Sequence, residues 1–190
     1  MQPPPPPPPS SPTNLATTHT LYLIRHGARY DYASSSRWAA LSKLPEVVPT
    51  DPPLSAFGLH QASRTAESMA DHIESDLAQS PSSTLSVFSS LYLRVVQTAL
   101  PLVHLLQSSL TSLSPSTCND GVLKIELGLC EFGHCYNTLP SPSARSQMFP
   151  EIDLEYEPLV ELGEMDWKEE EGGREGGVDY MRRVGKLSER

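Results

Sequence analysis

The stretch "LYLIRHGARYDY", from Leu21 to Tyr32, decides the fold class of this chain. Its first four residues are apolar, and such a short continuous run is typical of a strand that is buried on both faces. The predicted strand ends on Arg25 and His26. In open parallel sheets, ligands bind beyond the carboxyl ends of the strands. We therefore expect this arginine and this histidine to lie in a ligand-binding or catalytic site.

Downstream of this stretch, the apolar pattern alternates between helix and strand. Ser55 is a predicted helix N-cap, and apolar residues recur after it at steps of three and four as far as Leu77. The pattern next predicts a strand over 85–89, a helix from 91 that the proline at 101 should kink or end, a strand over 122–127 and a helix over 178–187. This order predicts an α/β fold with a mostly parallel sheet.

Composition and charge exclude several classes of protein. The chain has 190 residues, a net charge of −9 and a pI near 5.1, which argue against a nucleic-acid binder or a binder of anionic membranes. No apolar run approaches the roughly 18 residues that span a bilayer. Three cysteines are too few for a disulfide framework, so a cytoplasmic protein is expected, with the nucleus also open. Cys130, His134 and Cys135 fit no common zinc spacing, and we predict neither a metal nor a cofactor.

Residues 1–18 have the composition of a tail rather than of a packed domain. An unbroken run of prolines, from Pro3 to Pro9, favours an extended polyproline II conformation without internal hydrogen bonds. We expect a disordered leader, followed by one domain over 19–190. The alternative is a ligand for a domain that reads proline-rich motifs, but no basic residue flanks the run to orient it.

Charged residues follow all three predicted strands. Arg25 and His26 follow the first, Arg94 comes shortly after the second, and Glu131 comes shortly after the third. Arginine pairs with phosphate oxygens through two parallel hydrogen bonds, and a neutral histidine is a nucleophile. A carboxylic acid can protonate the departing alcohol oxygen. These residue types together predict a site for a phosphate monoester.

Three motifs resemble those of the histidine phosphatase superfamily, also called the phosphoglycerate mutase-like family. They are "LIRHGAR", "DPPLSAFGLHQA" and "SSLYLRVVQTA", the last with Leu91 in place of the usual proline. The resemblance implies a three-layer α/β/α fold and hydrolysis of phosphomonoesters through a phosphohistidine. The opening motif and "ELGLCEF" are most similar to the ubiquitin-associated and SH3 domain-containing phosphatases. A related branch, which contributes a subunit of an RNA polymerase III transcription factor, has a similar opening motif.

The resemblance also implies roles for single residues. His26 would attack phosphorus, Glu131 would donate a proton, and the phosphate oxygens would be held by Arg25, Arg94 and Arg29. Two alternatives stay open: Glu131 as a solvated acid, and Arg29 as an ion-pair partner of its neighbour at 31. The substrate would be a phosphorylated small molecule or a phosphoprotein. Arg145 lies outside every motif, and its replacement by alanine is expected to change phosphate binding little.

The second active-site histidine of the family has no counterpart in the sequence. That residue usually ends a strand with a V-S-H-G-like motif, and none of the histidines at 19, 60, 72, 104 and 134 lies in such a context. We therefore expect the domain to lack that C-terminal strand, and its activity and stability to be impaired. The alternative in a different class is a non-catalytic, phosphatase-like scaffold or subunit.

Overall fold

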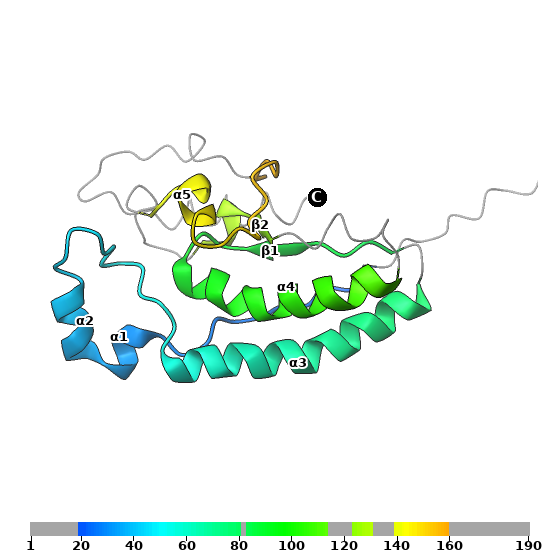
Figure 1. The fold of residues 1–190 in the computed structure, drawn as a ribbon, viewed down its shortest axis with the longest axis horizontal. Helices are drawn as coiled ribbons and strands as arrows, with labels where there is room; N and C mark the ends of the chain where they lie inside the picture. The colour runs from blue at the N-terminus through cyan, green and yellow to red at the C-terminus, as the bar shows by residue number, and fades with distance from the viewer. Residues whose placement is uncertain (1–18, 81–82, 114–122, 131–138, 160–190) are drawn as a thin grey trace, which may run out of the picture.

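The computed structural model describes residues 19–80, 83–113, 123–130 and 139–159 (Figure 1). The predicted tail, Glu131 and the predicted helix over 178–187 lie outside them. The elements, in order, are α1 Tyr30–Ala33, α2 Ser35–Leu41, α3 Ala56–Gln79, β1 Val87–Ser89, α4 Leu93–Leu113, β2 Leu123–Ile125, the 3-10 turn η2 Leu127–Leu129 and α5 Pro142–Ser146. None of the described helices is long and apolar enough to cross a membrane.

The two strands pair in parallel, as the alternating pattern predicts. Val87 pairs with Leu123 and Ser89 with Ile125. A further parallel bridge joins Leu123 to Ile152, so the segment after α5 runs along the free side of β2. Both strands are three residues long and thus shorter than the predicted ranges of 85–89 and 122–127. The prediction of an α/β fold with parallel strands is confirmed.

Helix α4 forms the middle of the molecule, because it packs against α3 on one side and against both strands on the other (Figure 1). The face that α3 buries follows the predicted spacing and consists largely of small residues: Ala62, Ala66, Ala70 and Ile73. Small side chains let the two helix backbones approach closely. Both helices begin at the same end of the molecule in Figure 1, which is the end that the carboxyl ends of the strands face.

The apolar run at 21–24 differs from its prediction. These residues belong to no strand, and Leu21 and Leu23 are 79% and 85% exposed. Tyr22 and Ile24 pack against the cluster that α3 and α4 form. The exposure therefore alternates, as it does where one face of an extended segment is covered and the other is not. The prediction of a strand buried on both faces was wrong for the part of the chain that the structure describes.

Of the two outcomes predicted for Pro101, a kink or an end of the helix, the end does not occur, because α4 continues through this residue to Leu113. Proline lacks the N–H that would bond to the carbonyl of Gln97, and this normally weakens a helix. Here the residues that follow it are buried in the core: Leu102, Val103 and Leu106. Tertiary packing on both sides of α4 thus outweighs the local penalty.

Candidate active site

The loop that contains Arg25 and His26 is fastened to the beginnings of α3 and α4 by hydrogen bonds. The backbone N–H of Gly27 donates to Thr98 Oγ1 at 3.2 Å, and that of Ala28 donates to Gln61 Oε1 at 2.8 Å. The carbonyl of Ala28 accepts from the N–H and the hydroxyl of Ser55, at 2.9 and 3.0 Å. These contacts fix the backbone on the C-terminal side of His26.

Two glycines let this loop touch α3 directly. A Cβ atom on Gly27 would lie 2.5 Å from the carbonyl oxygen of Gly58, and one on Gly58 would lie 2.1 Å from the carbonyl oxygen of Ala28. The obstructing atoms belong to the backbone, so they cannot rotate away as a side chain could. The two backbones therefore approach as closely as they do only because neither glycine has a side chain.

Ser55 has a second role, because its side chain caps α3. The hydroxyl oxygen accepts from the N–H of Gly58 at 3.0 Å while the hydroxyl donates to the carbonyl of Ala28. The predicted N-cap is thus confirmed. One hydroxyl joins the start of the helix to the loop that carries His26, and this holds the predicted site residues at the amino end of α3.

The ring of His26 is held by its own backbone neighbour. Nδ1 lies 2.8 Å from the carbonyl oxygen of Gly27. A carbonyl oxygen can only accept, so Nδ1 carries the proton of the neutral ring. The lone pair of the neutral imidazole is then on Nε2. In this tautomer Nε2 is the nitrogen that can act as a nucleophile.

His26 lines a small hollow of about 130 Å³ at the amino ends of α3 and α4. The other lining residues are Arg25, Gly27, Gln61, Ala62, Thr65 and Thr98. One water molecule occupies roughly 30 Å³ of the liquid, so the hollow has room for several water molecules or for a small anion. The hollow combines a cation, hydroxyl groups and an amide with the histidine, which suits a small anion.

The three predicted phosphate-binding arginines have different surroundings. Arg25 is exposed and lines the hollow. Arg29 pairs with Asp31 through two contacts, at 2.7 and 3.0 Å, and its guanidinium lies 4.5 Å from the ring centroid of Tyr32. Arg94 is buried, with its guanidinium 4.2 Å from the ring centroid of Tyr92. Arg25 and His26 therefore line the same hollow. Arg29 and Arg94 are not among the described residues that line it.

Arg145, which lies outside every motif, has a structural place that the sequence did not indicate. It lies on α5, is 4% exposed, and forms an ion pair with the equally buried Asp51. The same guanidinium donates to the carbonyl of Leu91 at 3.3 Å. A buried charge must be paired and hydrogen-bonded. Arg145 therefore belongs to the core beside the amino end of α4 and not to the surface.

The end of β2 carries a buried carboxylate that the sequence reasoning did not single out. One oxygen of Glu126 accepts from the N–H of Gly128 at 2.8 Å, and the other accepts from the hydroxyl of Tyr156 at 2.9 Å and from the N–H of Leu159 at 2.8 Å. These bonds cap η2 and tie the segment after α5 to the sheet. The prediction had placed weight on Glu131, which lies outside the described residues.

The residues that sequence reasoning missed stand inside the quoted motifs. Gln61 and Thr98 bind the loop after His26, and Gln97 accepts from the N–H of Leu54 at 2.8 Å. The motifs contain these polar residues at fixed places, which was the available signal. Their function is to satisfy backbone groups of distant loops, and this cannot be read before the partners are known.

Among the comparisons with known proteins, only the search of solved structures found similar chains. The crystal structure of the ecdysone phosphate phosphatase, EPPase, from Bombix mori in complex with tungstate is similar with a TM-score of 0.56 and 20% sequence identity. The match covers 86% of this chain and 63% of that chain, so this chain spans less than two thirds of the length of its structural neighbour. No family model and no curated protein matches the sequence. The likeness confirms the predicted α/β, phosphoglycerate mutase-like fold.

Proposed function

We propose that this chain carries a phosphomonoesterase site of the histidine phosphatase type, with His26 as the nucleophile. The observation that carries the proposal is the bond from His26 Nδ1 to the carbonyl of Gly27, at 2.8 Å, beside the hollow that Arg25 also lines. It leaves the lone pair on Nε2. The structural neighbour was solved with tungstate, which is a tetrahedral oxyanion like phosphate.

The reaction has two steps. In the first, a bond forms between Nε2 of His26 and phosphorus while the ester P–O bond breaks, and the alcohol leaves with a proton, for which Glu131 is the proposed donor. In the second, a water molecule gives a proton to the carboxylate of Glu131 while its oxygen bonds to phosphorus and the P–N bond breaks, so that inorganic phosphate, neutral histidine and the protonated acid result. Arg25 offsets the charge of the phosphate oxygens in both steps.

The proposed substrate is a phosphorylated small molecule or a phosphoprotein. By resemblance of the motifs, we assign the chain to the branch of the ubiquitin-associated and SH3 domain-containing phosphatases, and we propose Arg29 and Arg94 as further phosphate ligands. We also propose a cytoplasmic or nuclear location, and a reader of proline-rich motifs as a partner for residues 1–18. No direct contact with nucleic acid or membrane is proposed, because the net charge is −9.

A second function, anion binding without efficient turnover, is favoured by the surroundings of the arginines. Arg29 is engaged by Asp31, and Arg94, in the buried start of α4, is not among the described residues that line the hollow. Preorganised donors around the transferring group each contribute roughly 100- to 1000-fold in rate, so fewer of them lower the turnover strongly. This is the phosphatase-like scaffold of the alternative hypothesis.

Trapping of the phosphohistidine tests the proposal. We expect a ³²P-labelled aryl phosphate to label the wild-type chain, the label to be lost in acid, and His26→Ala to abolish the labelling. His60→Ala is the matched control, because His60 is exposed on α3 and lies outside the hollow. An acid-stable label, or a label that survives His26→Ala, contradicts the assignment. Binding of vanadate without any labelled intermediate selects the scaffold.

A further inference from the structure

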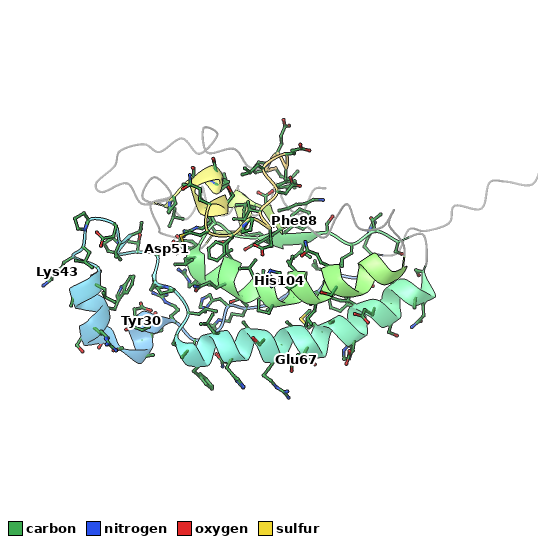
Figure 2. The ribbon with its side chains drawn as sticks, viewed as in Figure 1. Tyr30, Lys43, Asp51, Glu67, Phe88 and His104 are labelled. Carbon is green, nitrogen blue, oxygen red and sulfur yellow. The ribbon has the colours of Figure 1, made fainter. Side chains whose placement is uncertain are left out.

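The beginning of α4 is held by a buried ion pair that belongs to none of the steps above. Asp51 precedes α3, Arg145 lies on α5, and the two meet at the amino end of α4, where Figure 2 labels the aspartate. One carboxylate oxygen of Asp51 accepts from the N–H of Leu93, the first residue of α4, at 2.8 Å. The other accepts from Arg145, which also donates to the carbonyl of Leu91. The pair thus contacts the turn before α4 and the first residue of the helix.

The first turns of α4 carry residues that reach the candidate active site. The hydroxyl of Thr98 donates to the carbonyl of Arg94 at 2.7 Å and accepts from the N–H of Gly27, the residue next to His26. Any shift or rotation of the amino end of α4 therefore moves the acceptor that holds Gly27. It also moves Arg94, which is a proposed phosphate ligand.

The turn before α4 has an additional need for support. Leu91 stands where the motif it resembles has a proline. A proline fixes the φ angle of such a turn, whereas a leucine leaves it free. In this chain the hydrogen bond from Arg145 to the carbonyl of Leu91 restrains the same turn from outside. The position of the arginine thus matches the place at which the local sequence gives least restraint.

A stabilising role alone accounts poorly for this pair. Both residues are 4% exposed, and Nε of Arg145 has no hydrogen-bond partner among the described residues. Removing two charges from water is unfavourable, and replacing a buried pair with apolar residues is often neutral or stabilising. What such a pair does supply is direction, since the planar guanidinium fixes the angle between the groups that it joins.

We propose that Asp51 and Arg145 are positioning residues, which set the orientation of α4 so that Thr98 and Gly27 hold His26 in place for binding an oxyanion. The inference rests on the proposed function. It adds two residues to the site that do not touch the substrate and that the motifs do not reveal as a pair, since they stand 94 positions apart.

The experiment compares the double variant Asp51→Asn/Arg145→Met with Ile73→Ala. The double variant removes both charges, so no unpaired charge is left in the core. Ile73 is buried in the cluster between α3 and α4, away from the pair, and supplies a variant destabilised by packing alone. At a temperature where both are folded, we expect orthovanadate, measured by calorimetry, to bind the double variant about tenfold more weakly than wild type. The control should bind it as wild type does. Unchanged affinity in the double variant overturns the proposal.

A second measurement keeps this test separate from the proposed function. If the wild-type chain binds no vanadate, the oxyanion site fails, and the positioning is judged from the NMR signal of the Gly27 amide without any anion. The chemical shift of this amide should change in the double variant and should remain that of wild type in Ile73→Ala. If the double variant does not fold, Arg145→Lys takes its place, because lysine keeps the charge but lacks the planar guanidinium. The chemical shift of the Gly27 amide should then change in Arg145→Lys. A Gly27 signal that no variant moves overturns the positioning role.

Discussion

Residues 21–24 and residues 25–29 are neighbours in the chain, but different forces hold them. The first group has one apolar face against α3 and α4, and its other face is exposed. The second group is tied by hydrogen bonds to Ser55, Gln61 and Thr98. The comparison teaches that the loop with His26 is held mainly by hydrogen bonds, from the beginnings of two helices and from the segment before α3, where Arg29 forms an antiparallel bridge with Leu54. Both backbone groups and the side chains of Ser55, Gln61 and Thr98 contribute to these bonds.

The largest effect should come from the glycine contact that lets this loop approach α3. Alanine has a higher helix propensity than glycine by about 1 kcal/mol, so propensity alone predicts that Gly58→Ala stabilises the chain. The Cβ would lie 2.1 Å from the carbonyl oxygen of Ala28, so we expect instead a loss on the order of 3 kcal/mol. Urea unfolding measures the difference. Ser63→Ala, exposed on the same helix, is the control and should change little.

A stable Gly58→Ala variant would contradict the close approach of the two backbones. It would show that the loop can move away from α3 at no cost, and that residues 25–29 are held as loosely as residues 21–24. The vanadate affinity of the same variant distinguishes a displaced loop from an undisplaced one.

Thr98→Val should have the next largest effect, because it keeps the shape of the side chain and removes the hydroxyl. Thr98 is 6% exposed, and its oxygen accepts from the N–H of Gly27 at 3.2 Å. A buried donor that loses its acceptor costs about 1–3 kcal/mol, and we expect a loss of about 2 kcal/mol in urea unfolding. Hydrogen exchange of the Gly27 amide should accelerate. Thr98→Ser keeps the hydroxyl, so protection that is lost equally in both variants would contradict this role.

The long-range order of the fold could be predicted from the sequence where the apolar spacing was regular. The buried face of α3 and the parallel pair of β1 and β2 follow from spacing alone. The run at 21–24 could not be predicted in the same way, because burial on both faces depends on neighbours that the run does not encode. Pro101 does not end α4 for a similar reason: packing of the helix in the core outweighs the hydrogen bond that proline cannot form.

The sequence predicted the reactive residues of the candidate site, but not the residues that hold them in position. Arg25 and His26 stand out because charged groups directly follow an apolar run. Asp51 begins one of the quoted motifs and Arg145 lies outside all of them, and only the fold brings the two together. The two residues stand 94 positions apart in the chain. Their pairing depends on tertiary structure, so no local pattern could have indicated that Arg145 is buried.

The smallest expected effect concerns the pair of His104 and Glu151, which joins α4 to the segment beside β2. Nε2 of His104 lies 2.6 Å from the carboxylate, and the backbone carbonyl of Glu151 accepts from the N–H of Leu123 at 2.8 Å. Partial burial of Glu151 opposes its ionisation, but the hydrogen bond from His104 and one from the backbone outweigh this and lower its pKa below the ordinary value of 4.5.

Because the folded pKa of Glu151 is lowered, the unfolded chain binds more protons as acid is added. The stability from this group is fully present above its ordinary pKa of 4.5 and is lost as the pH falls through the lower folded value.

His104 is 56% exposed, so water screens the pair, and we expect His104→Ala to cost only about 0.5 kcal/mol at about pH 6. Urea unfolding of both proteins at about pH 6 and about pH 3 checks the sign. The difference should shrink in acid, because a protonated Glu151 no longer distinguishes the two proteins by charge. A difference that is equally large at both pH values would mean that His104 stabilises α4 by packing, and that the pair plays no part in holding the segment beside β2.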